Sequence, residues 1–444
     1  MSNKKGKHSD INFASKTEVE SISYHTGDGS LDRPGKIEIT LTKKLAKKED
    51  LALAYSPGVA GPCRVIAKDK NAVYDLTAKG NLVAVISNGT AILGLGNLGP
   101  EASKPVMEGK AMLFKAFADI DAFDLELKGT DVNKLAEVIM ALEPTFGGIN
   151  LEDIKAPECF ELEAILTQEM EIPVFHDDQH GTAVVASAGL LNALFLVDKD
   201  ISDVKVVFSG AGASAIATAK MFISLGVRKD NLFMFDSKGL ITEKRDNLTK
   251  EKLLFAQKHS DSISLKEVIS GADVFVGLSG PGVLTKDMVK TMADKAVVFA
   301  MANPTPEILP EEVYAVRKDI IVGTGRSDYK NQVNNALGFP FIFRGALDSR
   351  ARRISEGMKM AAAMAIAKVC RKNWPKDIAK GKRKPSVEEL TSIAIVPAPT
   401  DKNLLLEVPF AVFESASKEG IARKDFNEKE YKNYLKKISK KVKL

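Results

Sequence analysis

The chain has 444 residues, enough for two or three domains at about 150 residues each, and its 45% apolar and 27% charged residues are typical of a folded globular protein. This composition excludes a peptide, a collagen-like chain and an extensively disordered protein. Lys and Arg outnumber Asp and Glu by 63 to 58, but residues 427–444 alone hold seven Lys and two Glu. The rest of the chain is therefore neutral, which argues against a nucleic-acid-binding surface across the fold.

Residues 1–34 form a polar N-terminal extension, which we expect to be extended. The chain starts with basic residues but without the apolar segment of a signal peptide, and no stretch approaches the ~20 apolar residues that span a bilayer. Cys63, Cys159 and Cys370 are odd in number and form no CxxC motif, so we expect neither a disulfide framework nor a structural zinc site. The sequence therefore predicts a cytoplasmic protein without a membrane partner.

Residues 35–178 are predicted to form a first α/β domain. Between residues 71 and 99 the short apolar runs VYDL, NLVAVI and TAILGLG are separated by Gly and Asn, which predicts two strands that lead into a loop. From Lys104-Pro105 onward apolar residues recur at helical spacing, and proline is tolerated in the first turn of a helix. We therefore expect a helix to open there.

From Val204 onward strand-like and helix-like segments alternate. The apolar runs VKVVFSG, NLFMFD, ADVFVGLS, AVVFAMAN and DIIVGTG are separated by helical patterns, which predicts a parallel, doubly wound sheet. Beyond Asn331 the pattern is mostly helical, and these helices are expected to return and pack on both domains. The second domain is placed at residues 179–415, and the basic tail at 416–444 is interpreted as a solubilising helix end rather than a site for an anionic partner.

Two loops, at residues 94–99 and 210–215, have a GxGxxG-like pattern. A strand precedes the second loop, a helix follows it directly, and Asp236 ends the next strand about 20 positions on, as in a dinucleotide-binding loop. The first loop runs into Pro100 and a polar stretch, where no helix is expected, so we interpret it as a substrate-side loop. The second domain is therefore predicted to be Rossmann-like and to bind NAD or NADP through Gly210, Ala211, Gly212, Ala213 and Ser214.

The residues after this second strand bear on the choice of cofactor. Asp236 would accept a hydrogen bond from a ribose hydroxyl and repel a 2′-phosphate, which favours NAD. Ser237 and Lys238 follow directly, and Lys244 and Arg245 are near in the sequence. Because one charge-assisted hydrogen bond from Lys238 could outweigh the repulsion, we predict a modest preference for NADP over NAD.

Oxygen ligands gather upstream, at Glu152-Asp153 and at His176-Asp177-Asp178-Gln179-His180. Two His at i and i+4 suggest an HExxH-type zinc hydrolase, but the helix is expected to begin only at Gly181, so the two imidazoles need not share a face. Four carboxylates without a cysteine suit Mg²⁺ or Mn²⁺ better than zinc. Helix capping and solvated loop acids remain the alternative interpretation of this cluster.

Taken together, these motifs resemble the malic enzymes in their short bacterial form. The resemblance covers about residues 35–415 in order. Its segments are LALAYSPGVAGPC at 51–63, SNGTAILGLGNLGPEASKPVMEGKAMLFK at 87–115, FGGINLEDIKAPECF at 146–160, FHDDQHGTA at 175–183, FSGAGASAIA at 208–217, FAMANPTPEI at 299–308 and GTGRSDYKNQVNNALGFPFIFRGAL at 323–347.

The resemblance implies the oxidative decarboxylation of (S)-malate to pyruvate and CO₂, with reduction of NAD⁺ or NADP⁺ and with Mg²⁺ or Mn²⁺. It implies Lys110 as the general base and Tyr55, within reach of Lys110, as the general acid. The implied metal ligands are Glu152, Asp153 and Asp178, with Asp177 as the acid beside them. Asn303 and Asn335 are implied to lie near the nicotinamide and malate.

One position departs from the longer eukaryotic members of that family. They carry a malate-binding arginine before the ILGLG segment, where this chain has Ala91. Arg326 is therefore the candidate for the distal carboxylate of malate. The family also implies a homo-oligomer, with a dimer as the expected form.

A catalytically silent nucleotide-binding or regulatory relative with the same fold remains the alternative function. The intact residues Tyr55, Lys110, Glu152, Asp153 and Asp178 favour the enzyme, since a silent relative has no reason to keep all five.

Overall fold

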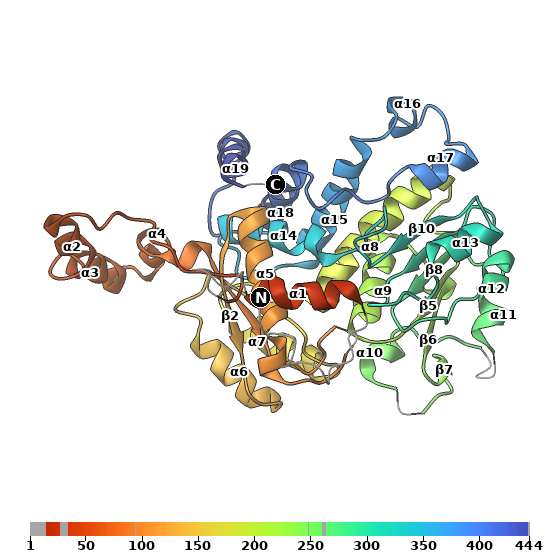
Figure 1. Cartoon of the computed structure of the whole chain (residues 1–444), viewed down its shortest axis with the longest axis horizontal. Helices are drawn as coiled ribbons and strands as arrows, with labels where there is room; N and C mark the ends of the chain where they lie inside the picture. The colour runs from red at the N-terminus through yellow and green to blue at the C-terminus, as the bar shows by residue number, and fades with distance from the viewer. Residues whose placement is uncertain (1–14, 27–33, 94, 247, 260–262, 443–444) are drawn as a thin grey trace, which may run out of the picture.

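The computed structural model describes residues 15–26, 34–93, 95–246, 248–259 and 263–442. Two largely parallel sheets covered by helices form its body (Figure 1). The predicted α/β class with a Rossmann-type second unit is therefore confirmed. The strands are β1 (Leu82–Ser87), β2 (Asp121–Glu126), β3 (Gly148–Leu151), β4 (Val174–His176), β5 (Val206–Ser209), β6 (Leu232–Asp236), β7 (Gly239–Leu240), β8 (Val274–Gly277), β9 (Val297–Ala300) and β10 (Ile321–Thr324).

The first sheet has the strand order β2-β1-β3-β4, and all its strands are parallel. All six residues of β1 are buried, as expected for a parallel strand covered on both faces. Because side chains alternate along a strand, Val83 and Val85 pack in the core that contains α5, and Ala84 and Ile86 pack in the core that contains α6 and α7. The helices are α5 (Pro100–Ala118), α6 (Val132–Ala141) and α7 (Glu158–Glu169).

The second sheet has the order β10-β9-β8-β5-β6-β7, with only β7 antiparallel to its neighbour. The chain proceeds from β5 to β6 on one side and returns to β8 on the other, so the order reverses at β5. In such sheets ligands bind outside the carboxyl ends of the strands at this point of reversal. The loop at 210–214 follows β5 directly and therefore lies at that position. Its helices are α9 (Ala213–Leu225), α10 (Lys250–Leu253), α11 (Leu265–Ile269), α12 (Lys286–Thr291) and α13 (Pro310–Val316).

Helix α8 (Asp177–Val197) joins the two sheets. By length and composition it is apolar enough to cross a membrane, but 78% of its most apolar window is buried inside the protein. It packs against α9 and against α15 (Glu356–Arg371) of the C-terminal region. We therefore interpret α8 as the core helix of the body, which explains why it is apolar on all sides.

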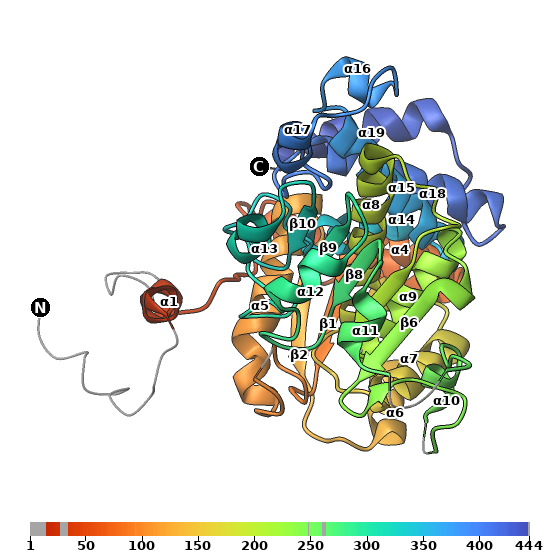
Figure 2. The ribbon, with the colours of Figure 1, turned by 90° about the vertical axis from the view of Figure 1, so that its right-hand side faces the viewer.

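The chain after residue 331 returns as helices that gather at one end of the molecule, as Figure 2 shows. The predicted returning helices are thus present. The basic tail forms α19, whose Tyr431, Leu435 and Ile438 are buried while its lysines face outward. These helices are α14 (Phe339–Asp348), α15 (Glu356–Arg371), α16 (Lys376–Ala379), α17 (Val387–Ser392), α18 (Asn403–Lys418) and α19 (Glu428–Lys441).

Helices α2 (Lys48–Ala54) and α3 (Ala60–Lys68) project from the body as an arm, which lies far from α5 and α8 in Figure 1. Neither helix has a buried residue. Leu51, Leu53 and Val65 are each more than half exposed. Isolated helices of this length are marginal in water, and the arm gains little stability from its own packing.

Several predictions for the N-terminal half are wrong. Part of the expected extended segment forms α1 (Lys16–Thr26), although most of residues 1–34 lie outside the described residues, as does Gly94. VYDL is the short helix α4 (Val73–Leu76), because a four-residue apolar run has no period that separates helix from strand. Among the described residues of the 71–99 segment, β1 alone is a strand.

The helix after the first glycine loop begins at Pro100, four residues earlier than predicted. The missing N–H of proline costs nothing in the first turn, where that group has no partner within the helix. A helix therefore does follow the first glycine loop.

Candidate active site

A cluster of carboxylates lies at the carboxyl edge of the first sheet. Glu152 and Asp153 follow β3, and Asp178 stands in the first turn of α8, after β4. Since β3 and β4 are parallel neighbours, their ends bring the three side chains together, with one ligand oxygen of each within 4.8 Å of the others. The Asp153 backbone N–H also donates to Asp178 Oδ2 at 2.8 Å. The structure thus assembles the three predicted metal ligands.

The electrostatics of the cluster fit a divalent cation. Burial, with added repulsion from Asp178, raises the pKa of Asp153 to about 7. Burial also raises the pKa of Glu152 well above its usual range. Asp153 Oδ2 is buried and has no hydrogen-bond partner among the described residues. Crowded, buried carboxylate oxygens with a vacant lone pair are the donor set of Mg²⁺ or Mn²⁺, so these residues fit such an ion.

Lys110 lies beside this cluster. Helix α5 carries its side chain, only 9% exposed, to 3.0 Å from Glu152 Oε1 and into hydrogen-bonding contact with Asp177 Oδ2. The ammonium also stands over the Phe339 ring, 4.4 Å from its centroid. Although burial opposes the charge, the carboxylates of Asp177 and Glu152 raise the pKa of Lys110. The lysine is therefore held protonated when no cation competes for the same carboxylates.

Gly181 allows Asp177 and Asn335 to approach each other. A Cβ at position 181 would lie 2.0 Å from Asp177 Oδ1 and 2.8 Å from the Asn335 Cβ. Glycine is unfavourable inside a helix such as α8, but here no larger residue fits. The arrangement brings the predicted Asn335 to the Asp177 side of the site.

The zinc-hydrolase interpretation does not fit the two histidines. Contrary to expectation, α8 begins at Asp177 and not at Gly181, because the two acids stabilise its first turn. His180 points to Glu163, at 2.9 Å, and so does not join the ligand cluster. The His176 ring is fully buried, and neither of its nitrogens has a hydrogen-bond partner among the described residues.

The second glycine loop has the geometry of a phosphate-binding turn. A Cβ on Gly210 (φ +114°) would lie 2.3 Å from the Leu278 carbonyl oxygen, so only glycine fits. Gly212 faces open space and precedes α9, whose first N–H groups receive no side-chain cap. This leaves donors for a pyrophosphate. The Ser214 hydroxyl donates to the Asp178 carbonyl oxygen, which couples this loop directly to the carboxylate cluster.

Asp236 is more strongly engaged than the sequence predicts. Arg245 donates to both of its oxygens, at 2.9 and 3.0 Å, and Lys252 Nζ donates to Oδ2 at 2.8 Å. These cations hold the pKa of the carboxyl below its usual range against the effect of burial. Ser237 and Lys238 are exposed at the same rim. Sequence reasoning missed Lys252 because it lies 16 residues after Asp236, and only the fold places α10 beside that carboxylate.

Three predicted residues do not join the cluster. Tyr55 ends α2 in the projecting arm and is 71% exposed, so it does not lie within reach of Lys110 of the same chain (Figure 1). Arg326, in the loop after β10, pairs with Asp328 at 2.6 Å. Asn303 follows β9 at the carboxyl edge of the second sheet and is exposed there.

Comparison with known proteins gives matches along most of the chain. The family described as "Malic enzyme, N-terminal domain" matches residues 34–167, and "Malic enzyme, NAD binding domain" matches residues 179–398. The NADP-dependent malic enzyme of Halomonas elongata is 52% identical over 88% of this chain and 93% of its own length. The crystal structure of malic enzyme from Pyrococcus horikoshii Ot3 superposes with a TM-score of 0.85 at 42% identity, covering 96% of each chain.

Other relatives are longer. The NAD-dependent malic enzyme of Rhizobium meliloti is 52% identical over 92% of this chain but only 53% of its own length. The chain spans about half the length of several such curated relatives. NAD-dependent and NADP-dependent relatives match equally well, so similarity alone does not decide the cofactor.

Proposed function

The chain belongs to the malic enzyme family, and from this premise we propose that it catalyses the divalent-metal-dependent oxidative decarboxylation of (S)-malate to pyruvate and CO₂, with reduction of NAD(P)⁺. One observation carries the proposal: a buried lysine, Lys110, contacts Glu152 and Asp177 inside a carboxylate cluster that is hydrogen-bonded to the dinucleotide loop. A silent relative would have no need of this costly arrangement of buried charge.

The chain's own residues account for the steps. Lys110, once neutral, can accept the proton of the C2 hydroxyl while hydride passes to the nicotinamide. Asp177 orients the lysine and accepts its hydrogen bond. Mg²⁺ or Mn²⁺ held by Glu152, Asp153 and Asp178 would supply a Lewis acid for the C2 oxygen and C1 carboxylate, and its charge would favour neutral Lys110. We assign malate binding to Asn335, which packs at Gly181 beside Asp177.

Protonation of the enolate carbon requires an acid near Lys110, and we assign it to Tyr55 of a second copy of the chain. The arm that carries Tyr55 projects from its own body and exposes Leu53 (76%) and Val65 (51%). A two-fold dimer would cover these side chains and insert the arm beside the partner's site. In this arrangement the expected homodimer is required for catalysis, because each site takes Tyr55 from the other copy.

The proposed function is tested by the products. Incubation with (S)-malate, NADP⁺ and Mg²⁺ is expected to form NADPH, pyruvate and CO₂ in equal amounts, measured by absorbance, a lactate-dehydrogenase assay and a CO₂ electrode. NADPH without CO₂ would indicate a simple malate dehydrogenase, and absence of all three would support the silent relative.

We propose NADP⁺ as the preferred cofactor. Arg245 and Lys252 both bind Asp236, so two cations face one carboxylate and the rim keeps a positive charge for a 2′-phosphate. Lys238, exposed at the same rim, is the further cation predicted from the sequence.

The Lys252→Met variant is expected to raise the KM for NADP⁺ about tenfold or more and to change that for NAD⁺ little, because a charge-assisted hydrogen bond contributes ~1.5–3 kcal/mol. Steady-state kinetics with both cofactors measure this, and Lys238→Ala tests the second cation. Lys250→Met, on the same helix and 92% exposed, is the control. Equal effects on both cofactors would assign Lys252 a structural role, and a wild-type preference for NAD⁺ would contradict the proposal.

We also place the activity in the cytoplasm. Cys63, Cys159 and Cys370 are all free thiols, which is the usual state of cysteines in a reducing compartment.

A further inference from the structure

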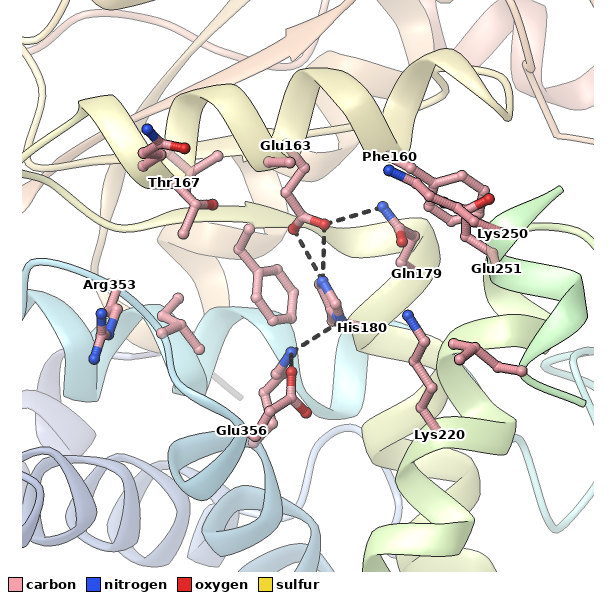
Figure 3. A pocket seen from close by; sticks show the side chains of 17 residues that line it. Phe160, Glu163, Thr167, Gln179, His180, Lys220, Lys250, Glu251, Arg353 and Glu356 are labelled. Carbon is pink, nitrogen blue, oxygen red and sulfur yellow. Dashed lines mark hydrogen bonds and ion pairs between the residues drawn. The ribbon is translucent and has the colours of Figure 1, made fainter. Parts of the chain in front are cut away.

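A second network of charged side chains contacts the β4–α8 junction, which also carries Asp177 and Asp178. Figure 3 shows it at the wall of a cavity of about 740 Å³. Its centre is Glu163 of α7, whose side chain is 15% exposed. None of the expected catalytic, metal or cofactor residues belongs to this network.

The Glu163 carboxylate receives three N–H groups from the junction. Its Oε1 accepts from the His176 backbone N–H at 3.0 Å, and its Oε2 accepts from Gln179 Nε2 at 3.1 Å. Both oxygens lie about 3 Å from His180 Nε2, at 2.9 and 3.0 Å (Figure 3). Although burial opposes its charge, His180 lowers the pKa of Glu163 to about 2. The carboxylate is therefore a permanent acceptor for residues on both sides of Asp177 and Asp178.

His180 connects this carboxylate to the C-terminal helices. Lys359 of α15 lies with Nζ 3.2 Å from His180 Nδ1, and its side chain is 6% exposed. A lysine ammonium can only donate, so Nδ1 accepts and Nε2 carries the proton given to Glu163. The partners thus assign one tautomer to His180 and fix the plane of its ring.

We propose that Glu163 is a positioning residue for the metal site, which holds Asp177 and Asp178 in place through the His176 backbone, Gln179 and the His180–Lys359 pair. Asp177 also contacts Lys110, and Asp178 accepts from the Asp153 N–H and the Ser214 hydroxyl. Glu163 instead restrains the residues directly before and after these two acids. Apolar side chains would join α7 to α8 at lower desolvation cost. A carboxylate at this position instead fixes the orientation of the residues that flank Asp177 and Asp178. A metal ligand such as Asp178 requires this fixed orientation.

The test is direct Mn²⁺ binding, followed by the electron paramagnetic resonance signal of free Mn²⁺, with no substrate and no turnover. Glu163→Gln keeps the shape of the side chain but leaves one acceptor oxygen and an NH₂ group to face the three N–H donors. We expect its Kd for Mn²⁺ to rise about 10- to 100-fold, the usual effect of removing a residue that orients a metal ligand. Asp348→Asn, which breaks the buried Arg344–Asp348 pair on α14, is the matched control and should leave the Kd unchanged even where it lowers the melting temperature.

The inference rests on the proposed metal-dependent function, and the binding assay separates the two. Failure of the wild-type chain to bind Mn²⁺ would overturn the proposed function itself. Wild-type binding with an unchanged Kd in folded Glu163→Gln, at a lowered melting temperature, would show that the network is only structural. If Glu163→Gln does not fold, Lys359→Gln is titrated with Mn²⁺ in the same way, because without the Lys359 ammonium the proton of His180 is no longer confined to Nε2. A raised Kd for Mn²⁺ supports the proposal, and an unchanged Kd overturns it.

Discussion

Replacing Lys110 with alanine is expected to lower kcat for malate oxidation by about 10²–10⁴-fold, the usual contribution of a positioned general base. The ammonium lies between Glu152 and Asp177, and no other lysine or histidine among the described residues contacts both carboxylates. Stopped-flow measurement of NADPH formation isolates the hydride-transfer step. The loss should appear in that step and not only in later release of products.

Lys115→Ala is the matched control for this variant. Lys115 lies on the same helix, is 57% exposed and pairs with Asp119 and Asp121 outside the site. Its removal should leave kcat unchanged. Near-wild-type hydride transfer in Lys110→Ala would show that the base is another group.

Tyr55→Phe is expected to lower overall turnover by a similar factor, since a general acid also contributes about 10²–10⁴-fold, but to leave NADPH formation partly intact. The decisive measurement mixes Tyr55→Phe and Lys110→Ala subunits. If each site takes its lysine from one copy and its tyrosine from the other, one site in every mixed dimer is intact. Random reassembly of a two-fold dimer should then restore about a quarter of wild-type activity.

If both groups come from the same chain, every site in the mixture lacks one of them, and no activity returns. Tyr24→Phe provides the control, because Tyr24 is also exposed (65%) but stands on α1 outside the arm. A monomeric wild-type protein that is fully active would contradict the assignment of Tyr55 to the partner's site.

The second sheet was predictable because strands and helices alternate regularly in the sequence. Each of β5, β6, β8, β9 and β10 falls within a predicted strand segment. The first sheet was harder, since VYDL and TAILGLG are too short to show a period. The start of α8 at Asp177 was missed because four consecutive polar residues conceal a first helical turn that the acids themselves stabilise.

Residue type and motifs that resemble a known family pointed to Glu152, Asp153 and Asp178, which the structure brings together. Their geometry depends on β3 and β4 being neighbours, which no local pattern shows. The cations at Asp236 illustrate the same limit, since Lys252 reaches that carboxylate from a separate helix. Tyr55 is the opposite case: its motif is recognisable in the sequence, but in the fold it is exposed on the projecting arm, away from Lys110.

The most direct test of the central claim is the metal dependence of the wild-type enzyme. The chain is dialysed exhaustively against EDTA, its metal content is checked by mass spectrometry, and NADPH formation from (S)-malate is followed while Mn²⁺ is added back. Because Glu152, Asp153 and Asp178 offer only oxygen ligands, activity should fall to background without metal and return with Mn²⁺ or Mg²⁺, and Asp178→Asn should need far more Mn²⁺ for the same rate. Full activity in protein that contains no detectable metal would contradict the account.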